Sequence, residues 1–159
     1  MSSWQKSIQG MVVVALVCSA GVGAGCGGDS STTASLTKAE FVKEGNAICK
    51  AGVAEKNAEI EAGLRAQAKE DGGKPMDQAA QEKFVTEVAV PPVRAMVEEL
   101  DELGLPSQGA KSAEAIIEEM ERALKTLEED PALALGTEDP FTAANAKATK
   151  YGLKECAQL

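Results

Sequence analysis

The side chains with the most distinctive chemistry in this sequence are the thiols of Cys18, Cys26, Cys49 and Cys156. A thiol can carry a covalent modification, ligate a metal or pair in a disulfide. No two of the four form a C-x-x-C motif, and distant pairs are usually structural, so a redox pair is the weaker interpretation. The sequence contains no His. His-based triads, His general bases and the usual zinc and di-iron sites are therefore excluded.

Carboxylates form the second candidate group, and they occur in the runs Glu98-Glu99, Asp101-Glu102, Glu118-Glu119-x-Glu121 and Glu128-Glu129-Asp130. Paired carboxylates can perform acid–base chemistry or bind a cation, but such runs are more often solvated helix faces. The alternating ligands and central Gly of an EF-hand are missing. No Ser or Thr stands in a G-x-S-x-G motif. We therefore predict no catalytic residue, no metal ligand and no cofactor, and we keep a carboxylate-based envelope hydrolase as a remote alternative.

The composition favours one acidic helical domain. The chain has 159 residues and a net charge of −9, and aromatic residues make up only 3%. A core built mainly from Ala, Val, Leu, Ile and Met suits closely packed helices better than a β-sandwich. The negative field disfavours a nucleic-acid partner, and it also repels anionic lipid headgroups.

Residues 1–25 predict a secretory signal. The apolar run Met11–Ala20 is shorter than the roughly 20 residues that a membrane-spanning helix needs. Small residues then lead to Cys26. This layout resembles the lipobox of bacterial lipoproteins, although Gly23 stands where Leu or Val is usual. The resemblance implies that Cys26 receives diacylglycerol, becomes the first residue of the mature chain and anchors it on the outer face of the cytoplasmic membrane.

Ordinary signal cleavage is the alternative, and it would give a secreted chain in which Cys26 is free. Cysteine parity favours the lipid. Cys18 leaves with the signal in either case, and modification of Cys26 leaves Cys49 and Cys156 as an even pair.

Four helices are expected in residues 37–159, after a flexible polar tether over residues 26–36. The second helix contains Pro91-Pro92, where two missing amides and ring clashes predict a kink or a break. The third has a heptad seam of apolar residues. In chain order, the signals are the capping box Thr37-x-x-Glu40, the start at Asp77, the seam Ala113, Ile116, Ile117, Met120, Ala123, Leu124 and Leu127, and the cap Asp139-Pro140-Phe141.

Small residues accompany both internal cysteines. Gly45 and Gly52 share a helical face with Cys49, and Ala148 and Gly152 recur at helical spacing before Cys156. A disulfide needs Cα atoms within about 7 Å, closer than two Leu-lined helices usually approach. We therefore predict an all-α, up-down-up-down four-helix bundle with a Pro-kinked second helix and a disulfide between the first and fourth helices.

The mature region resembles small uncharacterised helical lipoproteins of actinobacteria. The resemblance is carried by Leu36-Thr37-Lys38-Ala39-Glu40-Phe41 with Ala47-Ile48-Cys49, by Leu100-Asp101-Glu102-Leu103-Gly104 and by Tyr151-Gly152-Leu153-Lys154-Glu155-Cys156. It implies an extracytoplasmic helical domain and brings no activity with it.

These observations predict a non-enzymatic binding or interaction module of the cell envelope, whose partner is an unknown envelope protein or a small ligand. A helix break can open a groove between helices, where ligand sites tend to occur. The alternative function is therefore a carrier of a small apolar or cationic ligand, held in a groove formed by Val88, Pro91, Pro92 and Met96. A plain bend with no ligand is the simpler interpretation of the two prolines.

Overall fold

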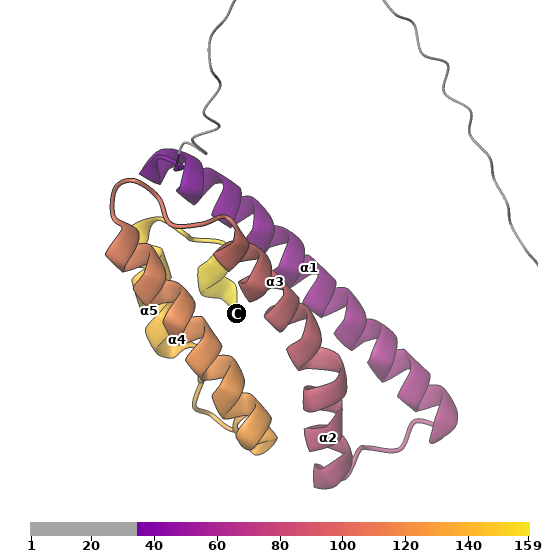
Figure 1. Ribbon diagram of the computed structural model, residues 1–159. Coiled ribbons are helices and arrows are strands. Elements are labelled where there is room, and N and C mark those ends of the chain that lie inside the picture. The colour runs from indigo at the N-terminus through magenta and orange to yellow at the C-terminus, as the bar shows by residue number, and fades with distance from the viewer. Residues whose placement is uncertain (1–34) are drawn as a thin grey trace, which may run out of the picture. The chain divides into compact units, whose positions relative to one another are not determined.

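The computed structural model describes residues 35–159, and this part of the chain contains helices and no strand. The predicted signal, Cys26 and most of the tether lie outside the described residues. The elements are α1 (Lys38–Glu70), α2 (Gln78–Phe84), the π-helical η1 (Val85–Ala89), α3 (Val90–Glu102), α4 (Ala110–Glu129), the 3-10 turn η2 (Pro131–Leu135), α5 (Thr142–Tyr151) and the 3-10 turn η3 (Cys156–Gln158). Figure 1 shows α1 lying along α3, with α4 and α5 on the other side of α3. The all-α prediction is confirmed.

The start of α1 is fixed by the predicted capping box. The Thr37 hydroxyl accepts a hydrogen bond from the Glu40 amide, and the Glu40 carboxylate accepts one from the Thr37 amide at 2.9 Å. Two amides that have no partner in the helix are thereby satisfied. The Ser107 amide donates to the Leu36 carbonyl at 2.7 Å, which ties this end of α1 to the loop between α3 and α4.

The second helix differs from the prediction at its prolines. The chain stays helical from Gln78 to Glu102, and the irregularity is the one-turn π-helix η1. Pro91 and Pro92 follow η1 and lie in the first turn of α3. Each proline lacks a backbone amide, and its ring would clash with a carbonyl of the preceding turn in a regular α-helix. The Val90 amide bonds to the Val85 carbonyl, five residues back, so the wider π turn connects the two regular segments.

The core lies between α1, α3, α4 and the C-terminal segment. All seven residues of the predicted heptad seam of α4 are buried. The largest side chains with almost no exposure include Phe41, Leu100, Ile116, Met120 and Leu153. The core therefore joins the first turn of α1 to the end of α3, the middle of α4 and the chain end.

The C-terminal segment departs from the predicted fourth helix. α5 ends at Tyr151, and Gly152 follows with a φ of 115°. The amides of Gly152 and Leu153 both donate to the Ala148 carbonyl, at 3.0 and 2.9 Å, which closes the helix end. The prediction of one helix reaching Cys156 was wrong, because Gly152 adopts the left-handed conformation and terminates the helix.

The Cys49–Cys156 disulfide is present, with a Cα–Cα distance of 4.8 Å, and both side chains are fully buried. It joins α1 to the turn η3, and α5 itself packs on α4. The small residues of α1 pack against α3 and the C-terminal segment, and not against the predicted fourth helix. A Cβ on Gly52 would lie 2.5 Å from Met96 Cγ of α3, and a Cβ on Gly45 would lie 2.8 Å from Leu153 Cδ2.

Candidate functional site

A cleft of about 340 Å³ opens between the η1–α3 junction, the C-terminal half of α4 and the segment that leads into α5. Its walls are mainly aliphatic, with one aromatic ring. The apolar residues that line it are Val85, Ala89, Val90, Val93, Leu124, Leu127, Leu133, Ala134, Pro140, Phe141 and Leu159. A concave, mostly apolar pocket with a few polar groups is the usual form of a small-ligand site, and this volume lies at the small end of that range.

The third wall of the cleft depends on two turns in the sequence. Asp130 and Pro131 end α4 and begin η2, which brings Leu133 to the cleft. Asp139 then organises the start of α5: its Oδ1 accepts from the Phe141 amide at 2.9 Å, and its Oδ2 accepts from Asn145 Nδ2 at 3.3 Å. The sequence predicted Asp139 as the N-cap and Pro140 as the first helical residue, whereas α5 begins at Thr142 with Phe141 at the N-cap position. The Asp139 bonds instead fix the turn before the helix and hold the Phe141 ring, which is 5% exposed, against the cleft.

Lys56 is the only cation among the described residues that line the cleft. It stands on α1 in the same stripe as Gly45, Cys49 and Gly52 and is half-buried. Its ammonium makes no hydrogen bond or ion pair with any residue in the described part of the chain. Loss of hydration lowers the pKa of Lys56, and the charge of Asp139 opposes this shift. The cleft therefore presents a partly desolvated positive charge beside apolar walls.

The acidic groups at the cleft limit what that charge can attract. Glu138 and Asp139 both line it, but both Asp139 oxygens accept the hydrogen bonds described above. The Lys56 charge is therefore not neutralised by direct contact. With one cation and two carboxylates among the described residues of the lining, a ligand with more than one negative charge would be repelled.

The structure divides the predicted groove residues. Val88, Pro91 and Pro92 line a separate depression of about 330 Å³ with Glu55, Glu59 and Glu87. Met96 is only 2% exposed and packs under Gly52, so it lines neither hollow. The larger apolar cleft lies on the other face of the same helix, at Val85, Ala89, Val90 and Val93.

Sequence reasoning missed Lys56 as a site residue. It was visible as a charge within the apolar stripe of the first helix, and a cation in such a stripe is a signal for a functional position. Leu133 and Phe141 could not be assigned to the cleft, because their positions depend on how η2 packs against α2, η1 and α4.

Two further observations bear on the chemistry of the described residues. No group of three or more His, Cys, Asp or Glu side chains in residues 35–159 is arranged to hold a metal ion. Within the same range, no helix is long and apolar enough to cross a membrane.

No family model, curated protein or solved structure matches this chain.

Proposed function

We propose that this chain is a non-enzymatic binding module of the cell envelope, anchored by a lipid on Cys26 to the outer face of the cytoplasmic membrane. The signal-like layout of residues 1–25 supports the location outside the cytoplasmic membrane, and the cleft supports the binding role. The domain would be an up-down-up-down bundle of α1, α3, α4 and α5, and the π turn before Pro91 would replace a kink.

The observation that carries the binding role is the apolar cleft of about 340 Å³ beside Lys56. Among the described residues, the combination of mainly apolar walls and a single cation distinguishes this cleft from the acidic depression at Pro91 and Pro92. A hollow of this size at the junction of η1, α4 and η2 supports a ligand with an apolar body. The proposed ligand is a small amphiphile whose single negative charge meets the Lys56 ammonium.

The binding role is tested with a pair of variants on the same helical stretch. Ala89 lines the cleft, while Ala95 lines the acidic depression on the other face. Ala89→Phe should fill the cleft, and Ala95→Phe should leave it open. The probe is 1-anilinonaphthalene-8-sulfonate, which is apolar and carries one negative charge, and its binding is followed by fluorescence titration.

We expect Ala89→Phe to weaken probe binding at least about tenfold, which corresponds to roughly 1.4 kcal/mol, with no change in Ala95→Phe. Circular dichroism shows that both variants are folded. Equal binding by the two variants would exclude the cleft as the site. Binding by neither variant nor the parent would favour the interaction alternative, with a protein partner in place of a small ligand.

The anchor is tested separately by metabolic labelling with a fatty acid in producing cells. The parent chain should carry the label and Cys26→Ser should not. Unchanged labelling of Cys26→Ser would refute the anchor, and absence of label in both chains would favour a secreted protein.

A further inference from the structure

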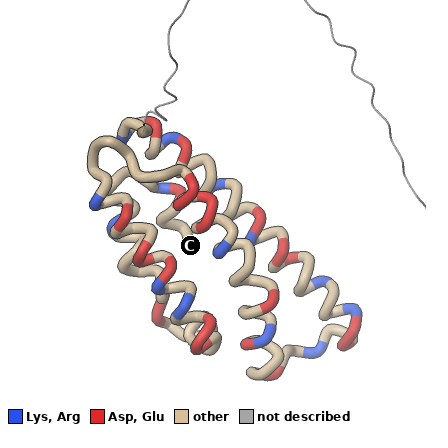
Figure 2. Tube along the Cα trace, viewed as in Figure 1, with Lys and Arg blue, Asp and Glu red and all other residues tan. Residues whose placement is uncertain are grey.

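A third hollow, at the end of the domain where α1 and α4 begin, has a lining of opposite charge to the rest of the chain. It measures about 460 Å³, and four of its lining residues are lysines: Lys38, Lys111, Lys147 and Lys150. No Asp or Glu of the described part of the chain lines it. The chain as a whole carries −9, so this basic pocket is a local reversal of sign. Figure 2 shows Lys or Arg positions at the starts of both α1 and α4.

Three of these lysines have charges that the fold leaves unpaired. Lys38, Lys111 and Lys150 form no ion pair within residues 35–159, whereas Lys147 pairs with Glu119 at 2.5 Å. Lys38 Nζ lies 4.5 Å from the centre of the Tyr151 ring, and this cation–π contact holds it at the pocket. Of the carboxylates near the pocket, Glu40 is in the capping box and Glu119 also bonds to Arg122. Glu114, one turn after Lys111 on α4, is exposed and forms no ion pair within residues 35–159.

Two further features of the basic pocket point to an anion. No side chain caps the N-terminus of α4, because Gly109 occupies the cap position, and uncapped amides together with the helix dipole favour a negative group. The Tyr151 hydroxyl has no hydrogen-bond partner in the described structure, but its oxygen is buried, so it meets an anion only if the side chain shifts. The lysine ammonium groups and the first amides of α4 are the donors that a phosphate oxygen would reach directly.

We propose that the basic pocket docks the domain on anionic phospholipid headgroups of the membrane that holds its lipid anchor. This inference rests on the anchor in the proposed function. Lys38 is the first residue of α1, and the 12 residues from Cys26 to Lys38 span at most about 40 Å. The anchor would therefore keep the pocket within reach of the headgroups at a high effective concentration.

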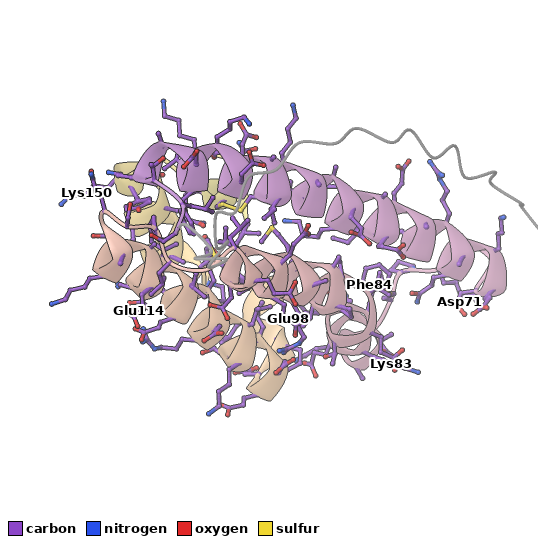
Figure 3. The ribbon with its side chains drawn as sticks, turned by 45° about the horizontal axis from the view of Figure 1, so that its top comes forward. Asp71, Lys83, Phe84, Glu98, Glu114 and Lys150 are labelled. Atoms are coloured by element: carbon purple, nitrogen blue, oxygen red, sulfur yellow. A yellow bond between two sulfur atoms is a disulfide. The ribbon has the colours of Figure 1, made fainter. Side chains whose placement is uncertain are left out.

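The acidity of the chain does not prevent this contact. Surface charges are screened over about 8 Å at physiological ionic strength, while α1 alone, with 33 residues, is about 50 Å long. Figure 3 shows Lys150 and the acidic Asp71 at opposite ends of the domain. The expectation from net charge that lipid headgroups are repelled therefore does not apply to the basic pocket itself, since four lysines and no carboxylate of the described residues line it.

Docking by this end would also orient the ligand cleft. Ser112 lines the basic pocket and Leu124 lines the cleft, and the 12 residues that separate them on α4 correspond to about 18 Å along the helix axis. The cleft would be held away from the lipid surface and would open to the space outside the membrane.

The test uses the mature chain purified from membranes and reconstituted in vesicles of phosphatidylcholine, with or without phosphatidylglycerol. Lysines are labelled with a membrane-impermeant N-hydroxysuccinimide ester and located by peptide mass spectrometry. Each basic residue near an anionic surface gains about 1 kcal/mol, or roughly fivefold. Labelling of Lys38, Lys111, Lys147 and Lys150 should therefore slow about fivefold or more in the anionic vesicles, while Lys69, Lys74 and Lys83 should label equally in both.

Matched triple variants separate a specific site from general charge. The variant Lys38→Gln/Lys111→Gln/Lys150→Gln should lose the protection of Lys147 in anionic vesicles. The variant Lys69→Gln/Lys74→Gln/Lys83→Gln has the same net charge and should keep it. Equal loss in both variants, or equal labelling of the parent in both kinds of vesicle, would overturn the docking proposal.

Two controls assign the remaining outcomes. In the first control, soluble glycerol phosphate is added to the chain in neutral vesicles. If it slows lysine labelling as strongly as anionic vesicles do, the basic pocket is a site for a free phosphate ester, and membrane docking is overturned. Failure of the chain to float with neutral vesicles would refute the anchor. In that case flotation with anionic vesicles alone would support docking, and flotation with neither would overturn it.

Discussion

At the scale of single residues, Lys56 and Asn46 show how α1 carries polar groups into contact with other parts of the fold. Lys56 is half-buried at the cleft without a direct partner in residues 35–159. Asn46 is fully engaged: its Nδ2 donates to the carbonyls of Val42 and Gly152, at 2.8 and 3.0 Å, and its Oδ1 accepts from the Glu155 amide at 2.9 Å. Lys56 can therefore still bind a ligand, whereas Asn46 joins the C-terminal turn to α1.

Replacement of Lys56 should change stability in a pH-dependent way. Burial lowers the pKa of Lys56 in the folded chain, so the unfolded chain binds more protons in the interval below its ordinary value of about 10.4. The cost of burying the charge is therefore present at neutral pH and disappears as the pH rises through this interval. Lys56→Met should be more stable than the parent at neutral pH, and the difference should shrink towards and above about pH 10.4.

Urea unfolding of the parent and Lys56→Met at several pH values measures this difference, and the comparison cancels the contribution of Tyr151, whose pKa burial raises. A difference that does not change with pH would contradict the assignment. The same variant should bind the sulfonate probe about tenfold more weakly if the ammonium meets the ligand charge, by roughly 1.4 kcal/mol.

Asn46→Ala should destabilise the domain by about 2–3 kcal/mol, because it removes three hydrogen bonds and leaves the partly buried Glu155 amide without its acceptor. Asn57→Ala is the control on the same helix, since Asn57 is exposed. Urea unfolding should show little change for the control. A small effect of Asn46→Ala would mean that water replaces its contacts.

At the scale of elements, the sequence predicted helices better than it predicted their neighbours. The start of α1 and the buried seam of α4 follow from local signals, and both are present. The predicted N-cap of the last helix was wrong, because Phe141 and not Asp139 occupies the cap position of α5. The partner of Gly45 and Gly52 was predicted incorrectly. A stripe of small residues indicates close approach but does not say which element approaches, and Met96 and Leu153 fill the space.

The end of α5 was missed for a related reason. Gly152 was interpreted as a small residue on a helical face, whereas its backbone has a positive φ and ends the helix. Glycine suits both roles, and the residues around it do not distinguish them. The cleft could not be predicted either, because it needs α3, α4 and η2 to be placed together.

Packing of α3 on α1 should be sensitive to a single methyl group at Gly52. An added Cβ at Gly52 would lie 2.5–2.8 Å from the Cβ, Cγ and Sδ atoms of Met96. The clash should cost about 1–3 kcal/mol, more than the roughly 1 kcal/mol that Ala gains over Gly in a helix. Gly52→Ala should therefore unfold at lower urea concentration than the parent.

Gly136→Ala is the control for that variant. The Cβ at Gly136 would have its nearest neighbour at 3.5 Å, and its φ of −87° suits any residue. The midpoint of this control should hardly move. If Gly52→Ala is more stable than the parent, Met96 moves aside, and the packing of α3 on α1 does not require glycine at position 52.

At the scale of the whole molecule, the described domain is closed by one covalent link near its two ends. Cys49 and Cys156 are 107 positions apart and fully buried, so the loop that they close contains most of the folded residues. In the chain-entropy account, a loop of this length stabilises the folded state by about 4–5 kcal/mol. This is a large part of the 5–15 kcal/mol that typical domains have.

Reduction of the disulfide, or Cys49→Ser/Cys156→Ser, should therefore lower the free energy of unfolding by about 4 kcal/mol. The domain should also lose the docking of Leu153 and the Asn46 contacts before α3 and α4 separate, because the C-terminal turn meets α1 through these groups. Hydrogen exchange would then show early loss of protection at Glu155, whose amide bonds to Asn46. Cys26→Ser, which leaves the disulfide intact, should unfold like the parent. Equal stability of the reduced and oxidised chains would mean that α1, α3 and α4 hold the fold without the link, and that the disulfide only secures the chain end.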